Sequence, residues 1–218
     1  MPSLQDLEKP ESELSSELYS SDNKLLGKYF RYNRSPVKFD ELSDELVTTL
    51  LVTEDIRFYD HSGIDLKGLV RASYGVVKNI ATLGSSGLEG GGSTITQQLA
   101  KNLFKIRREK KGKLSGVPFL GLVISKVKEW IVAVKLEEFY TKKEILAMYL
   151  NTAEYGSNSY GIKVAAKTYF NKLPSELNYN ESSIIVGLLN KPTKYNPYFN
   201  PSNDCLLYTS DAADDPWS

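Results

Sequence analysis

Apolar residues recur every three or four positions along most of the chain, which is the spacing of helices that bury one face. Helices are predicted over residues 65–80, 122–140, 142–149, 161–170 and 181–189. An earlier helix is marked by the apolar positions Leu42, Leu46, Val47, Leu50 and Leu51. Another helix follows the polar run at 93–98 and extends to about Arg108. Asp40 is the expected cap of the earliest helix. The sequence has neither an internal repeat nor a regular strand–helix alternation. The pattern therefore predicts a mostly α fold.

The predicted helix over residues 65–80 has an apolar stripe that we expect to face inward: Leu66, Leu69, Val70, Val76 and Val77. Residues 1–24 are rich in Ser, Glu and Leu and are expected to be loosely ordered, whereas residues 25–39 carry aromatic side chains that allow a short strand pair. Residues 81–92 hold five glycines in twelve positions, which predicts a loop.

A chain of 218 residues is long enough to bury the core of one ordinary domain. We expect a linker or pedestal over residues 1–40 and a single domain over residues 41–204. Residues 205–218 have no apolar periodicity and are expected to form a non-native or disordered tail.

No apolar run approaches the roughly 18 residues that a membrane-spanning helix needs. The longest candidate, residues 114–124, contains Gly116, Pro118 and Gly121. Two interpretations stay open for it: a segment that lies in a membrane surface, or a buried loop. The amino-terminal residues show no signal-peptide pattern, so we expect any membrane anchor to be absent from this chain.

Charge excludes some classes of function. Lys+Arg and Asp+Glu both number 27, so no net charge attracts nucleic acid. Residues 101–113 nevertheless carry seven basic residues and one acidic residue. This run is either a solvated face or part of a site, and near an anionic membrane each charge contributes about 1 kcal/mol of attraction. Cys205 is the only cysteine and His61 the only histidine, which excludes a disulfide framework and a centre of several histidines.

Two polar clusters carry the candidate chemistry. Residues 90–98 read Gly-Gly-Gly-Ser-Thr-Ile-Thr-Gln-Gln, so a glycine run leads into hydroxyl and carboxamide side chains at the start of a predicted helix. Glycines let the backbone approach a ligand closely, and a helix N-terminus suits anions. In the other cluster, residues 54–65, Glu54 supplies a carboxylate that could move a proton. Together the clusters indicate an active site.

The same residues form motifs in a definite order. The first is Glu54-Asp55-x-x-Phe58-x-x-His61-x-Gly63-x-Asp65, and the second is Gly92-Ser93-Thr94-Ile95-Thr96-Gln97-Gln98 followed by Lys101-Asn102. The third is Ser125-Lys126-Val127-Lys128-Glu129, and the fourth runs from Lys143 to Asn151 after Leu136-Glu137. With the helix at 161–170, they resemble the peptidoglycan glycosyltransferases of the glycosyltransferase-51 type over roughly residues 25–200. Ser125 stands where that family usually has arginine, and the chain ends before the family's fifth motif.

The resemblance implies a lysozyme-like helical domain with a small membrane-apposed subregion. It also implies polymerisation of lipid II into glycan strands, in which an acceptor hydroxyl attacks the anomeric carbon of the growing chain and undecaprenyl diphosphate leaves. The implied partners are lipid II, the growing glycan strand and the bacterial membrane surface, with no nucleic acid. The implied location is the extracytoplasmic face of the bacterial inner membrane, and the resemblance allows a transpeptidase domain in the full-length protein.

Roles follow from the resemblance residue by residue. Glu54 is the expected general base, and Glu129 is the second catalytic carboxylate. Glu129 could hold Mg²⁺ or Mn²⁺ against the diphosphate or orient the lysines, and the alternative is an ordinary i,i+3 ion pair with Lys126. Expected substrate-binding residues are Ser93, Thr94, Thr96, Gln97, Gln98, Lys101, Lys126 and Asn151. Expected structural residues near the site are Asp55, Phe58, His61 and Asp65.

Two other functions stay open. A lysozyme-like glycan hydrolase would use paired carboxylates and would need neither the lysine cluster nor the membrane segment. An inactive, truncated module that binds lipid or cell wall would fit Ser125 and the missing fifth motif.

Overall fold

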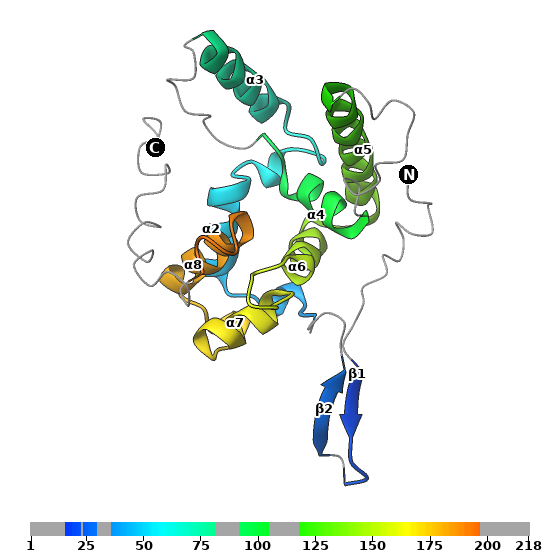
Figure 1. Ribbon diagram of the computed structural model, residues 1–218, viewed down its shortest axis with the longest axis vertical. Helices are drawn as coiled ribbons and strands as arrows, with labels where there is room; N and C mark the ends of the chain where they lie inside the picture. The colour runs from blue at the N-terminus through cyan, green and yellow to red at the C-terminus, as the bar shows by residue number, and fades with distance from the viewer. Residues whose placement is uncertain (1–15, 23, 30–35, 82–91, 105–117, 197–218) are drawn as a thin grey trace. The chain divides into compact units, whose positions relative to one another are not determined.

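The computed structural model describes residues 16–22, 24–29, 36–81, 92–104 and 118–196, and it confirms a mostly α fold (Figure 1). The helices are α2 (Asp44–Glu54), α3 (Leu66–Ala81), α4 (Ile95–Phe104), α5 (Pro118–Phe139), α6 (Lys142–Thr152), α7 (Ile162–Phe170) and α8 (Tyr179–Asn190). Short 3₁₀ helices are η1 (Phe39–Glu41), η2 (Phe58–Asp60) and η3 (Pro174–Glu176). The strands β1 (Ser16–Tyr19) and β2 (Leu25–Tyr29) form one antiparallel hairpin.

The chain folds into two compact units. The first comprises Glu54–Ile145 with the amino-terminal residues Met1–Pro10, and the second comprises Glu11–Thr53 and Leu146–Ser218. Of these ranges, residues 1–15 and 197–218 lie outside the described part of the chain, as does the predicted tail at 205–218. The predicted linker and domain boundaries stay predictions.

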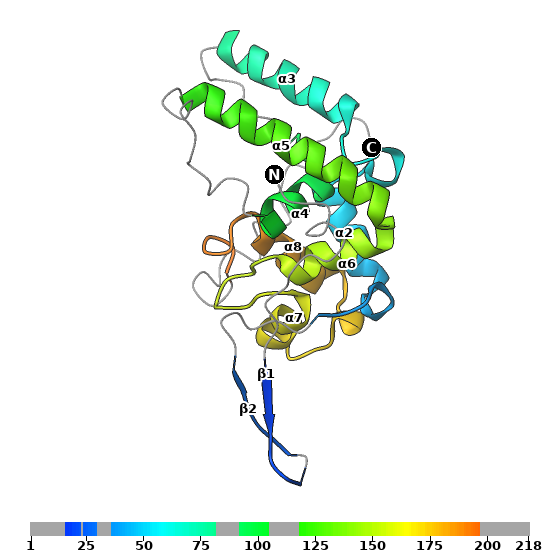
Figure 2. The ribbon, with the colours of Figure 1, turned by 90° about the vertical axis from the view of Figure 1, so that its right-hand side faces the viewer.

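In the first unit α4 packs against α5, and Figure 2 shows the two helices side by side. Both helices have apolar side chains that are completely buried: Ile95 and Leu99 on α4, and Ala133 and Leu136 on α5. Each large aliphatic side chain buried in this way contributes roughly 1.5–3 kcal/mol relative to exposure. The start of α4 is therefore held firmly against α5, and the polar residues of both helices have fixed neighbours.

In the second unit α2, α6, α7 and α8 contribute much of the core. Leu46, Leu50, Leu150, Ile162 and Ile185 are fully buried there. The α8 N-terminus has a capping box, in which the Asn178 side chain accepts from the Glu181 N–H and the Glu181 carboxylate accepts from the Asn178 N–H. Such reciprocal bonds satisfy donors that a helix N-terminus otherwise leaves unpaired.

The structure corrects several details of the sequence reading. Ser43, not Asp40, caps α2, because the Ser43 Oγ accepts from the Leu46 N–H at 3.2 Å. Leu66 and Val70 do not face inward, since they are 69% and 70% exposed. The side chains of Val76 and Val77, the predicted loop at 82–91 and the helix extension to Arg108 lie outside the described residues.

The prediction for the amino-terminal residues was correct in part. A strand pair exists, but its first strand is Ser16–Tyr19, inside the segment that we expected to be loosely ordered. A buried loop is likewise wrong for residues 118–124, which are helical, and Val123 and Ile124 are partly exposed. In the described residues, no helix combines the length and apolarity required to cross a membrane.

Candidate active site

Glu54 and Gln98 are in contact within the first unit. Glu54 is the last residue of α2, and its Oε2 accepts a hydrogen bond from the Gln98 Nε2 of α4 at 2.7 Å. The Glu54 side chain is only partly buried. The amide thus fixes one carboxylate oxygen, and a partly exposed carboxylate held in this way can accept a proton from a bound hydroxyl.

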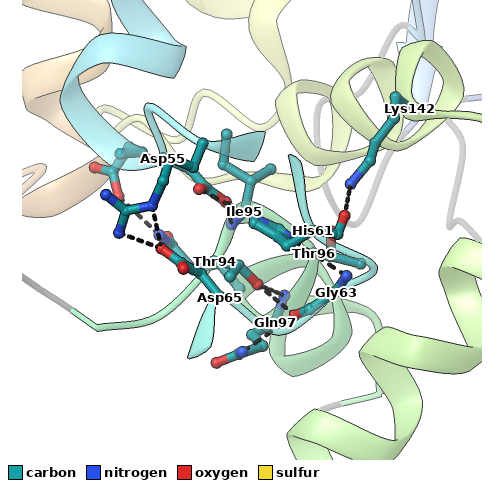
Figure 3. A network of polar contacts seen from close by, with 12 residues as sticks. Asp55, His61, Gly63, Asp65, Thr94, Ile95, Thr96, Gln97 and Lys142 are labelled. Atoms are coloured by element: carbon teal, nitrogen blue, oxygen red, sulfur yellow. Dashed lines mark hydrogen bonds and ion pairs between the residues drawn. The ribbon is translucent and has the colours of Figure 1, made fainter. Parts of the chain in front are cut away.

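The residue after Glu54 anchors this segment (Figure 3). The Asp55 Oδ2 accepts from the Ile95 N–H at 3.1 Å, and the Asp55 carboxylate lies 3.0 Å from the His61 Nε2. The His61 Nδ1 accepts from the Gly63 N–H at 3.2 Å. Since Nδ1 is the acceptor, the ring proton is on Nε2 and is donated to Asp55. Both ring nitrogens of His61 are therefore engaged within the site.

Gly63 forms hydrogen bonds with side chains at the start of α4. Its carbonyl accepts from the Thr94 Oγ1 at 2.8 Å and from the Gln97 Nε2 at 3.1 Å. Its φ is +85°, and a Cβ there would lie 2.9 Å from the backbone of Ala133. Only glycine accepts both constraints without strain. Thr94 and Gln97 are thus used for internal bonds, and the buried Gln97 Oε1 has no partner among the described residues.

Asp65 closes the first motif through an ion pair with Arg57. The Arg57 Nη2 and Nε lie 2.5 and 3.1 Å from the Asp65 Oδ2. Burial by itself would raise the pKa of Asp65, but the hydrogen bonds from Arg57 and Gly68 and the charge of Arg57 lower it overall. Asp65 therefore stays ionised at neutral pH and ties the end of the motif to Arg57, the residue that precedes η2.

Ser93, Lys126 and Glu129 form a second group. The Lys126 Nζ donates to the Ser93 Oγ at 2.7 Å and to the Glu129 Oε2 at 2.8 Å. Glu129 is 1% exposed, and Lys126 remains partly accessible. The buried carboxylate therefore fixes an ammonium and a hydroxyl side by side, which is a suitable arrangement for binding phosphate oxygens.

The predicted metal at Glu129 does not fit these neighbours, because its carboxylate is buried and already paired with an ammonium. No group of three or more His, Cys, Asp or Glu side chains suited to a metal ion occurs in the part of the chain that the structure describes. The involvement of Mg²⁺ or Mn²⁺ in the reaction stays a prediction, without Glu129 as an established ligand, and we derive no step through the ion.

A third group was missed by the sequence reasoning. The Thr96 Oγ1 donates to the Glu137 Oε1 at 2.6 Å, and the Lys142 Nζ lies 2.8 Å from the Glu137 Oε2. The Lys142 Nζ also donates to the His61 carbonyl at 2.6 Å and lies 4.2 Å from the centre of the buried Phe58 ring. Glu137 and Lys142 both come shortly before the Lys143–Asn151 segment of the fourth motif, but nothing in their spacing indicates these tertiary partners.

The remaining predicted residues differ in placement. Lys101 lies on α4, three residues after Gln98, and is partly buried. Asn151 belongs to the second unit, where its amide accepts from the Val37 N–H at 3.0 Å and donates to the Val37 carbonyl at 2.8 Å. The predicted roles of the site residues, including substrate binding by Asn151, stay predictions.

Comparisons with known proteins agree with the motif order. A sequence model of the family described as Transglycosylase matches residues 22–206. Penicillin-binding protein 1A of Haemophilus influenzae is 39% identical over 191 residues, which cover 88% of this chain and 20% of that protein. Penicillin-binding protein 1A of Escherichia coli K12 is 35% identical over 199 residues, which cover 91% of this chain and 21% of that protein. The chain thus spans about a fifth of the length of these relatives.

A crystal structure of penicillin-binding protein 1A from Haemophilus influenzae aligns with 90% of this chain and 17% of that chain, at 21% identity and a TM-score of 0.42. The family of this chain follows from the sequence matches.

Proposed function

This chain belongs to the transglycosylase family and is a domain of the peptidoglycan glycosyltransferase class, and we propose that it polymerises lipid II into glycan strands. The observation that carries the proposal is the Glu54 carboxylate, partly exposed and held by Gln98 at 2.7 Å. The Lys126 ammonium, held by Ser93 and Glu129 in the same unit, supplies a positive charge toward a diphosphate leaving group.

In the proposed reaction the 4-hydroxyl of the acceptor sugar attacks the anomeric carbon of the growing chain. The bond from that carbon to undecaprenyl diphosphate breaks, and the diphosphate leaves with the electron pair. Glu54 takes the hydroxyl proton as the new glycosidic bond forms, because a sugar hydroxyl is too weak an acid to lose its proton unaided. Lys126 and Ser93 then stabilise the diphosphate charge, and Lys101 is the second cation that we assign to it.

The relatives support a setting for this reaction. They are bacterial penicillin-binding proteins of which this chain spans about a fifth. We place the reaction at the extracytoplasmic face of the bacterial membrane, in a protein that is anchored there. A transpeptidase domain in the full-length protein is part of the same proposal.

The test is incubation of the 218-residue chain with labelled lipid II in detergent, once with Mg²⁺ and once with a chelator. The proposal expects glycan ladders. Shortening of preformed glycan strands would instead indicate a hydrolase, and a folded chain that binds lipid II but forms no product would indicate a binding module. Ladders that survive chelation would overturn the predicted role of the divalent ion.

A further inference from the structure

The ion pair between Lys142 and Glu137 lies among the residues of the site and has no role in the proposed chemistry. Lys142 is the first residue of α6. A cation at that position is unfavourable for the helix, because the N-terminus already carries partial positive charge. Its stabilising contacts are therefore tertiary ones.

Lys142 holds the segment that follows Glu54 and Asp55. Its Nζ donates to the His61 carbonyl at 2.6 Å and lies 4.2 Å from the Phe58 ring centre. The ring of the same His61 donates to Asp55, and Asp55 accepts from the Ile95 N–H. The Lys142 ammonium thus fixes the backbone of His61. The His61 side chain in turn anchors Asp55, the residue next to Glu54.

Glu137 connects Lys142 to the start of α4. Its carboxylate binds Lys142 at 2.8 Å and accepts from the Thr96 Oγ1 at 2.6 Å. Thr96 lies in the first turn of α4, two residues before Gln98, which binds Glu54. The Glu137 side chain is 7% exposed, so water competes little for these bonds.

We propose that Lys142 and Glu137 form a positioning pair that fixes the segment of Asp55 and His61 against the start of α4, and thereby sets the position of Glu54 for proton transfer. The inference rests on the proposed function of Glu54. Neither member of the pair is assigned a contact with substrate, so its loss should lower kcat and leave KM nearly unchanged. A displacement of about 1 Å at a catalytic group is enough to cost up to a hundredfold in rate.

The variants are Lys142→Met, Lys142→Gln and Glu137→Gln, with Lys172→Met as the matched control. Lys172 forms an ion pair with Glu181 at 2.6 Å in the second unit. Lys142→Met removes the donor to the His61 carbonyl, whereas Lys142→Gln keeps an N–H donor without the charge. Glu137→Gln keeps an acceptor for Thr96, and the Lys142→Gln and Glu137→Gln variants carry the comparison if Lys142→Met does not fold.

Well below the melting temperature of each variant, we expect kcat for lipid II polymerisation to fall about tenfold to a hundredfold in Lys142→Met, with KM within about twofold of wild type. Lys142→Gln should lose less activity, and Lys172→Met should keep the wild-type kcat. A folded Lys142→Met variant with wild-type kcat, or an equal loss in Lys172→Met, would overturn the positioning role.

Hydrogen exchange of single amides gives a readout that does not need activity. The amides of Ile95 and Gly63 donate to Asp55 and His61, so they should exchange faster in Lys142→Met and at the wild-type rate in Lys172→Met. Unchanged protection in Lys142→Met would overturn the inference. A wild-type chain that forms no glycan would refute the proposed function, while the exchange result would still decide the positioning role.

Discussion

Glu54 and Gln98 show how much of the site depends on single polar contacts. The carboxylate ends α2, and the amide that binds it comes from α4. The motifs predict that both residues matter, but they assign Gln98 to substrate. In the structure the Gln98 Nε2 donates to Glu54, and a group that orients a base changes the rate more than it changes the binding of substrate.

Replacing Gln98 by Leu should therefore lower kcat about tenfold, because the Glu54 carboxylate loses the donor that orients it. Steady-state polymerisation of lipid II measures this effect. Asn190→Leu, which removes an exposed amide at the end of α8, is the control and should be neutral. An unchanged kcat in Gln98→Leu would show that the contact does not orient the base.

Asp65 gives a prediction about pH. Its pKa is lower in the folded protein than its ordinary value of 3.8, so its ionised form stabilises the fold. That contribution is complete above about pH 5 and is lost as the pH falls through the folded pKa. Asp65→Asn should thus be less stable than wild type by about 1 kcal/mol at pH 7, which is typical of a partly exposed ion pair.

Urea unfolding of both proteins from pH 7 down to pH 2 measures the difference. The difference in the free energy of unfolding should shrink below pH 4. It should approach the small remaining difference that is due to the lost hydrogen bonds. A difference that stays constant over this range would mean that ionisation of Asp65 does not stabilise the fold.

At the scale of elements, periodicity located the helices but not their surroundings. The apolar stripe on α3 predicted that Leu66 and Val70 share a face, and they do lie four residues apart, yet the structure leaves that face exposed. A periodic pattern specifies which side chains share a face, whereas tertiary packing decides what covers it. The cap of α2 was misplaced for a related reason: Asp40 and Ser43 are both cap-forming residues, and only the observed backbone distinguishes them.

Gly161, just before α7, tests the backbone geometry of the second unit. Its φ is +86°, and a Cβ would lie 2.9 Å from the Asn151 carbonyl oxygen. Gly161→Ala should lower the free energy of unfolding by about 1–3 kcal/mol. Asn171→Gly is the control, because Asn171 caps the C-terminus of α7 at a φ of +56° and glycine accepts that geometry without strain. Asn171→Gly should therefore change the free energy of unfolding much less. Thermal or urea unfolding of both variants measures this, and equal effects would contradict the assignment of strain to Gly161.

At the scale of the whole molecule, motifs close in sequence were easier to interpret than contacts between distant segments. The run from Gly92 to Gln98 and the run from Glu54 to Asp65 are each local, so the sequence locates both clusters, and the family resemblance implies the roles of their residues. The bonds from Lys142 to His61 and from Thr96 to Glu137 join residues 81 and 41 positions apart. No local pattern encodes such pairings, because they depend on how the packed helices bring their side chains together.

The most direct test of the central claim compares Glu54→Gln with wild type in the polymerisation of labelled lipid II, with binding of lipid II measured separately. Glu138→Gln, which changes an exposed carboxylate on α5, is the matched control. We predict that Glu54→Gln slows polymerisation by about a hundredfold to ten-thousandfold, the usual contribution of a general base, while lipid II binding and the activity of Glu138→Gln stay unchanged. Glycan ladders formed by Glu54→Gln at the wild-type rate would contradict the role of Glu54 as the base.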